Sequence, residues 1–191
     1  MNKLWIRLVV LACLVVVGPL AAKNSTLQVG NTVPDFQLTN QRGEKVSLSD
    51  FKDKGVIISF LYTQCPYPDK CAMIGSKLTN LAELSKKIGK ADKLQVIAIT
   101  LDPVRDSPEV LKAYAQGFDE KHDNWSFLTG SESDIARVAG AFGVIYWSEK
   151  GVIEHNMRTA FIDGSGTLQV LKSGSDWKPG QLAAEIKKYL R

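Results

Sequence analysis

The sequence is poor in cysteine, with three in 191 residues, and this excludes a fold held together by disulfides. A chain of this length can bury a core large enough to fold without such staples. The sequence also lacks a basic stripe and any patch that interleaves aromatic and basic residues, and its formal net charge is only +4. Nucleic acid is therefore not an expected partner. With 45% hydrophobic and 23% charged residues, and without internal repeats or low-complexity tracts, the composition is typical of one globular domain.

The N-terminus has the order of a secretory signal peptide. Lys3 and Arg7 give a positive start, an unbroken apolar run covers residues 8–17, and small residues follow a Gly-Pro break up to residue 22. A retained anchor is the alternative, because residues 5–22 approach the roughly 20 residues that a membrane span needs. Cleavage would leave 22 basic against 20 acidic residues, a net charge of +2. Either way we expect an exported protein in the bacterial periplasm, soluble or tethered to the inner membrane by residues 1–22.

Apolar periodicity divides the remainder of the chain, residues 23–191, into alternating strands and helices. Continuous apolar runs indicate two strands covered on both faces, at residues 55–62 and 94–101. Hairpins are expected on either side of turns, and helices where the apolar spacing is three to four: hairpins at 30–48 and 157–171, helices at 71–90, 107–118, 131–142 and 179–190. This order predicts an α/β fold, a mixed sheet with helices on both faces and an N-terminal β-hairpin.

Two cysteines stand in the segment YTQCPYPDKC, residues 62–71, between a predicted buried strand and a predicted helix. In open α/β sheets this carboxyl edge of the strands is where ligands bind. A helix N-terminus there is expected to lower a thiol pKa, and the position argues against a buried structural role. Five residues separate Cys65 from Cys71, too many for a thioredoxin-type pair. A disulfide, electron exchange and a metal site all stay open at this point, although an oxidising compartment requires protection of free thiols.

His155 precedes the predicted strand at residues 157–163, so it is expected at the same edge as Cys65 and Cys71. A lone histidine is ordinarily a surface or satisfied residue. Two thiols and one imidazole together, however, suit a thiophilic ion, Cu(I) above all, while Cu(II) also accepts the imidazole. Zinc generally takes a fourth ligand.

Five further motifs carry a resemblance to a known family: ISFLYT (58–63), TLDPVRDSPEVL (100–111), WSFLTG (125–130), VAGAFGV (138–144) and His155 with FIDG (161–164). With these motifs the sequence resembles the Sco/SenC family, thioredoxin-fold copper proteins that serve cytochrome c oxidase assembly. The resemblance covers roughly residues 34–190 and implies a thioredoxin-like domain at 23–191.

The resemblance also implies a function. Cys65, Cys71 and His155 would bind copper, as Cu(I) and as Cu(II), for delivery to an oxidase subunit or another cuproprotein. Alternatively the chain would reduce the cysteines of that copper centre, with a periplasmic thiol reductant as a further partner. It is implied to be a metallochaperone rather than an enzyme.

The cysteine motif departs from the family pattern, in which three residues separate the two cysteines. The run PDKC at 68–71 keeps the second half, but Tyr67 stands where the first cysteine would align, and Cys65 lies two residues earlier. The longer loop adds well under about 1 kcal/mol of closure entropy, and Pro66 stiffens it. Copper binding and closure of a Cys65–Cys71 disulfide are both feasible at this spacing.

A thiol-disulfide oxidoreductase of the thioredoxin superfamily, acting on exported proteins through a redox-active Cys65–Cys71 pair, is the main alternative. That superfamily has a two-residue gap and a cis-proline before the third core strand, whereas residues 144–163 contain no proline. A peroxiredoxin is rejected, because Thr63 is two rather than three residues before Cys65 and residues 55–64 lack proline.

Overall fold

The computed structural model describes residues 26–118 and 124–190. The signal peptide or anchor predicted for residues 1–22 lies outside them. Within the described ranges, none of the helices is both long and apolar enough to cross a bilayer.

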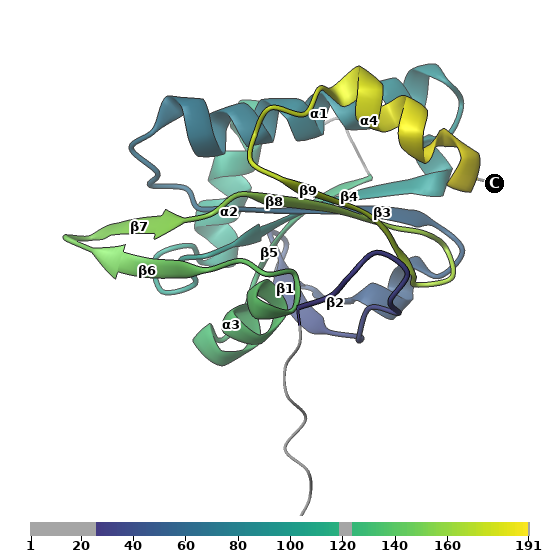
Figure 1. Ribbon diagram of the computed structural model, residues 1–191. Coiled ribbons are helices and arrows are strands. Elements are labelled where there is room, and N and C mark those ends of the chain that lie inside the picture. Colours follow the sequence, from purple (N-terminus) through teal and green to yellow (C-terminus); the bar gives the residue numbers. More distant parts are fainter. Residues whose placement is uncertain (1–25, 119–123, 191) are drawn as a thin grey trace, which may run out of the picture.

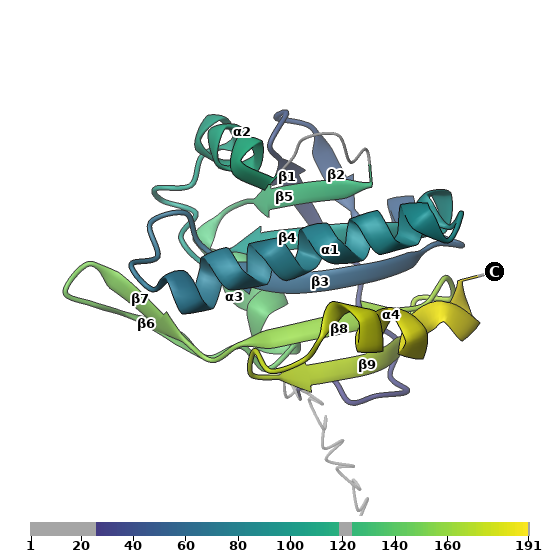
Figure 2. The same ribbon diagram turned by 90° about the horizontal axis from the view of Figure 1, so that it is seen from above.

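A seven-stranded mixed sheet forms the centre of the molecule, in the order β2-β1-β5-β4-β3-β8-β9 (Figures 1 and 2). Its strands are β1 Gln37–Asn40, β2 Lys45–Ser47, β3 Gly55–Leu61, β4 Leu94–Thr100, β5 Trp125–Thr129, β8 Arg158–Ile162 and β9 Leu168–Ser173. The strands β3, β4 and β5 run parallel and are buried at every position, whereas β8 and β1 pair antiparallel with β3 and β5. The predicted N-terminal hairpin is β1–β2.

Helices cover both faces of this sheet, as the sequence predicted. The helices α1 (Met73–Lys87) and α4 (Pro179–Ile186) lie on one face and α3 (Glu132–Ala141) on the other, as Figure 1 shows. Helix α2 (Pro108–Ala115) packs against β5. Short 3₁₀ turns occur at Leu48–Phe51, Ala91–Lys93, Gln116–Phe118 and Lys187–Tyr189, and a π-helical turn at Pro68–Ala72.

The sequence did not predict β5 or a separate two-stranded ribbon. The ribbon consists of β6 (Tyr146–Glu149) and β7 (Val152–His155), and it projects beyond the sheet in both views (Figures 1 and 2). A two-residue turn with positive φ at Lys150 and Gly151 joins its strands. Most ribbon side chains are exposed or half-buried, so the sequence carries no alternating apolar pattern there. The strand β7 leads directly into β8, and this brings the ribbon to the carboxyl edge of β3.

Candidate functional site

The two cysteines of the segment 62–71 lie on different structures after β3. Cys65 is half-buried in the loop that follows the strand, and its Sγ lies 3.7 Å from the carbonyl oxygen of Tyr67. Cys71 belongs to the π-helical turn Pro68–Ala72, and only 2% of it is exposed. Both are free thiols.

Burial raises the pKa of the Cys71 thiol, and the neighbouring Cys65 thiol raises it further. The prediction that a helix N-terminus would lower the thiol pKa here is therefore wrong for Cys71. The reason is geometric, because the α-helix begins only at Met73 and Cys71 lies before it, buried within the π-helical turn. In the metal-free protein Cys71 is consequently a protonated thiol.

His155 ends β7 and faces Cys71. Its Nδ1 donates to the carbonyl oxygen of Asn156 at 2.8 Å, because a carbonyl can only accept, so Nε2 carries the free lone pair. This Nε2 lies 3.9 Å from Cys71 Sγ. Burial lowers the pKa of His155, against an opposing effect of the Asn156 carbonyl, and keeps the ring neutral. A neutral imidazole whose second nitrogen is held by a carbonyl is the form that binds metals.

The separation of Cys71 Sγ and His155 Nε2 approaches the value for two ligands that share one ion. Metal–sulfur and metal–nitrogen bonds of about 2.3 and 2.0–2.1 Å place the two atoms roughly 3.6–3.8 Å apart at tetrahedral to trigonal angles. In residues 26–118 and 124–190, however, no three His, Cys, Asp or Glu side chains form a ready-made metal-binding cluster. The structure thus brings together Cys71 and His155, with Cys65 beside Cys71, and Cys65 would have to turn for all three to share an ion.

Tyr62 closes the site on the side of the core. Its hydroxyl accepts a hydrogen bond of 3.3 Å from the backbone of Ile153, and its ring stands edge-on to His155 at 6.3 Å between centroids. Burial and the adjacent thiol of Cys65 raise its pKa, so the hydroxyl stays neutral.

Asp106 fixes the start of the cysteine loop, although sequence reasoning did not single it out. The side chain is fully buried and accepts hydrogen bonds from Thr63 Oγ1 (2.5 Å), the Thr63 backbone (3.1 Å) and Thr100 Oγ1 (2.5 Å). A carboxylate that closely follows a buried strand was the available signal. Arg105 next to it bonds the Asp102 carboxylate, Gln64 and the carbonyl oxygen of Gly151, and so links this loop to the ribbon turn.

Lys70 and Glu154 are two further residues that the sequence reasoning missed. The Tyr67 hydroxyl donates to Glu154 Oε1 at 2.9 Å, and Lys70 Nζ lies 3.4 Å from Glu154 Oε2. Lys70 Nζ also stands 4.0 Å above the Tyr67 ring. These hydrogen bonds lower the pKa of Glu154 and raise that of Tyr67, so carboxylate and hydroxyl are acceptor and donor at neutral pH.

An apolar groove of about 330 Å³ adjoins the site, between the loop at 101–105 and the ribbon. Four large hydrophobic side chains are exposed around this edge of the molecule: Tyr67, Val104, Ile145 and Trp147.

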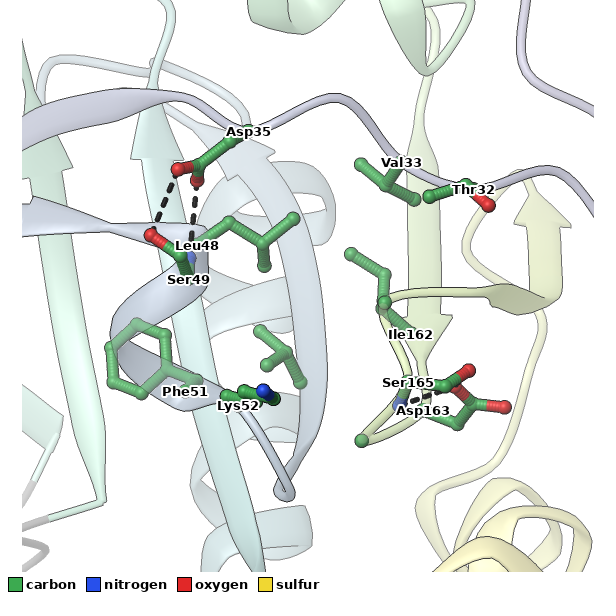
Figure 3. A pocket seen from close by; sticks show the side chains of 13 residues that line it. Thr32, Val33, Asp35, Leu48, Ser49, Phe51, Lys52, Ile162, Asp163 and Ser165 are labelled. Atoms are coloured by element: carbon green, nitrogen blue, oxygen red, sulfur yellow. Dashed lines mark hydrogen bonds between the residues drawn. The ribbon is translucent and has the colours of Figure 1, made fainter.

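A second cavity, of about 260 Å³, lies at the other end of β3 and β8 (Figure 3). Val33, Leu48 and Ile162 contribute apolar walls, while Asp35 bonds Ser49 and Asp163 bonds Ser165 at the rim. It contains neither a thiol nor an imidazole, so the chemistry of the cysteine motif belongs to the opposite end of the sheet.

Known proteins of one family are similar to this chain in sequence and in fold. The family model described as SCO1/SenC matches residues 24–191. A SCO2-like protein of Rickettsia felis is 36% identical over 139 residues, which cover 69% of this chain but only 64% of the length of that protein.

Solved structures are similar over most of the chain. ScoI of Bradyrhizobium japonicum with copper bound has a TM-score of 0.69 and 28% identity, covering 85% of this chain and 100% of that one. BsSco, described with a disulfide switch and as a member of the Sco family of cytochrome c oxidase assembly proteins, has a TM-score of 0.72 and 26% identity, covering 87% and 98%. The thioredoxin-like α/β fold expected from the sequence is thereby confirmed.

Proposed function

The chain belongs to the SCO1/SenC family, and from this premise we propose that it binds copper through Cys65, Cys71 and His155 and delivers it to a respiratory oxidase copper centre. The observation that carries the proposal is the contact between Cys71 Sγ and the lone pair of His155 Nε2 at 3.9 Å. Support also comes from the copper bound to ScoI of Bradyrhizobium japonicum.

Copper is the cargo of this site. Two thiolates and an imidazole are soft enough to favour Cu(I), and the imidazole also allows Cu(II). As the ion binds, each thiol releases its proton to solvent, and the bond to the metal offsets the cost of burying the Cys71 thiolate that forms. Three ligands leave one position open, through which a ligand of the acceptor protein enters before Cys65, which is more accessible than the buried Cys71, departs.

We place this activity outside the cytoplasm, in the bacterial periplasm, with residues 1–22 as signal peptide or membrane tether. The acceptor is a copper-binding oxidase subunit or another cuproprotein, and a periplasmic thiol reductant would keep the cysteines reduced. The description of BsSco as a cytochrome c oxidase assembly protein supports this class of partner.

Thiol-disulfide exchange is the second candidate function. It is favoured by the pairing of a half-buried thiol, Cys65, with a buried one, Cys71, since an accessible thiol can attack a partner disulfide and the second can resolve the mixed disulfide. The two thiols would become one disulfide, and the two electrons and two protons would pass to the partner's disulfide.

An anaerobic competition titration of Cu(I) against a chelator tests the copper proposal on the purified, reduced protein. We expect one-to-one binding, and we expect Cys65→Ala, Cys71→Ala and His155→Ala each to weaken it by at least about tenfold, or ~1.4 kcal/mol. Circular dichroism checks that each variant is folded. Wild-type affinity in His155→Ala would remove the histidine from the ligand set. If the wild type does not bind Cu(I), thiol-disulfide exchange becomes the preferred function. The reduction potential of the Cys65–Cys71 pair is then the quantity to measure.

A further inference from the structure

The side chains of Tyr67, Lys70 and Glu154 connect the cysteine loop to the ribbon, and we call these three residues the clasp. Tyr67 and Lys70 come from the cysteine segment, whereas Glu154 comes from β7 and is the neighbour of His155. One carboxylate thus receives a hydroxyl on one oxygen and an ammonium on the other, at 2.9 and 3.4 Å. The clasp therefore joins the two segments that carry the candidate ligands.

The ribbon needs such a connection. Within residues 26–118 and 124–190 its two strands pair only with each other, and an isolated two-stranded ribbon is at best marginally stable in water. Other hydrogen bonds that hold the ribbon join Ile153 to Tyr62, Arg105 to Gly151, and the Asn156 side chain to Gly143 and Ile145. None of these bonds involves the turn that bears Cys71, whereas the clasp joins that segment to Glu154, the neighbour of His155.

We propose that Tyr67 is a positioning residue: its hydroxyl holds the cysteine loop closed against the ribbon, so that Cys71 and His155 face each other before a metal arrives, and opening of the clasp admits the acceptor. The consequence for copper rests on the proposed function, but the closure itself is a property of the metal-free chain. Tyr67 is suited to this role because it lies two residues from Cys65 and its hydroxyl reaches across to β7.

The clasp is strong enough to hold the loop and weak enough to open. Tyr67 is 36% exposed, and the Lys70 and Glu154 side chains are 34% and 27% exposed, so water competes for each contact. One hydrogen bond to a carboxylate in such a setting shifts an opening equilibrium by about three- to tenfold. Local opening on that scale leaves the rest of the fold intact.

Alkylation of Cys71 measures opening of the clasp without copper. Because Cys71 is buried, its rate of reaction with iodoacetamide in the reduced full chain reports the open population, and mass spectrometry resolves it from Cys65. We expect about three- to tenfold faster alkylation of Cys71 in Tyr67→Phe, which keeps the ring beneath Lys70 and removes only the hydroxyl. Glu154→Ala should match it, and the double variant should react no faster than either single one.

Two further variants separate positioning from a general loss of structure. Glu154→Gln retains an oxygen acceptor for the Tyr67 hydroxyl and should stay within about twofold of the wild-type rate. Tyr189→Phe is the matched control, since its hydroxyl makes no hydrogen bond in the described part of the chain and it lies on the turn after α4. A wild-type alkylation rate in Tyr67→Phe, or fully additive effects of the two clasp substitutions, overturns the proposal.

Cu(I) release separates this proposal from the proposed function. In a chelator chase, Tyr67→Phe should release Cu(I) about three- to tenfold faster than the wild type at unchanged stoichiometry. If the wild type binds no copper, the proposed function fails. The alkylation rates still test whether the clasp holds the cysteine loop against the ribbon. If the wild type binds copper and Tyr67→Phe releases it at the wild-type rate, the role of the clasp in transfer is overturned.

Discussion

Asp106 shows how a single buried residue sets the geometry of the whole cysteine loop. Its carboxylate lies in the core without an ion pair among the described residues, and it is satisfied by two hydroxyl groups and one backbone amide. Thr100 ends β4 and Thr63 lies two residues after the end of β3, so the carboxylate ties the start of the cysteine loop to the end of β4. Cys65 lies two residues after Thr63.

Replacing Asp106 with alanine should therefore destabilise the fold and free the loop. Loss of the carboxylate leaves two buried hydroxyls and an amide without an acceptor, which costs about 1–3 kcal/mol or more. Urea denaturation measures the change, and Asp92→Ala is the control. Among the described residues Asp92 forms only an exposed pair with Lys93, so its replacement should change stability by less than about 0.5 kcal/mol. Equal midpoints for Asp106→Ala and the wild type would contradict this role.

Residue types and their spacing were sufficient to predict Cys65, Cys71 and His155 as candidates, because few side chains carry thiol or imidazole chemistry. Asp106 and Glu154 escaped prediction, since carboxylates are common and only the fold reveals which of them is buried or reaches the site. The pKa of Cys71 was predicted in the wrong direction, because burial of a turn before a helix leaves no trace in local sequence.

At the scale of elements, the long apolar segments were predictable and the short ones were not. The strands β3 and β4 and the helix α1 are continuous or strongly periodic in sequence, and each was expected close to where it lies. The ribbon was missed because its stability comes from contacts with the site, through Tyr62, Arg105 and the clasp, rather than from a buried apolar face.

Gly75 illustrates how packing between elements overrides helix propensity. It lies inside α1, where alanine would ordinarily gain up to about 1 kcal/mol. A Cβ at this position would come within 2.4 Å of the Phe118 ring, which is itself held against Trp125 and Phe127. We expect Gly75→Ala to lose about 1–3 kcal/mol through overpacking, measured by thermal unfolding.

The matched control for Gly75 is Gly140 in α3, whose added Cβ would meet nothing within 4 Å. Gly140→Ala should leave the stability unchanged or raise it by up to about 1 kcal/mol. If both alanine variants were stabilised alike, the close approach of α1 and Phe118 could not be important.

For the molecule as a whole, the thiol site and the cavity of Figure 3 occupy opposite ends of the same central strands. At the cavity end, burial alone would raise the pKa of Asp163, but hydrogen bonds from Ser165, Gln169 and the backbone outweigh it and lower the pKa below the ordinary value of 3.8. A carboxyl group with a lowered pKa stabilises the fold above its unfolded pKa, and that contribution is lost as the pH falls through the folded value.

Acid unfolding should accordingly depend on Asp163. We expect the stability of the wild type to fall as the pH drops below about 3.8, and Asp163→Asn to show a shallower decline over the same range, because the amide does not titrate. Urea midpoints measured at a series of pH values give both slopes. As a control, the alkylation rate of Cys71, at the far end of the sheet, should be the same in both proteins. If the urea midpoints of the wild type and Asp163→Asn fall in parallel with pH, Asp163 does not contribute to acid unfolding.

The loop and the π-helical turn Pro68–Ala72, which connect β3 to α1, determine how the spacing of the two cysteines can be changed. The buried stripe of α1 starts at Ile74, after the turn, and β3 is complete at Leu61, before the loop. Residues gained or lost in the exposed loop between Tyr62 and Cys71 would leave the buried positions of β3 and α1 in register. The spacing of the two cysteines can therefore be altered by an insertion or deletion in this loop while the packing of β3 against α1 is retained.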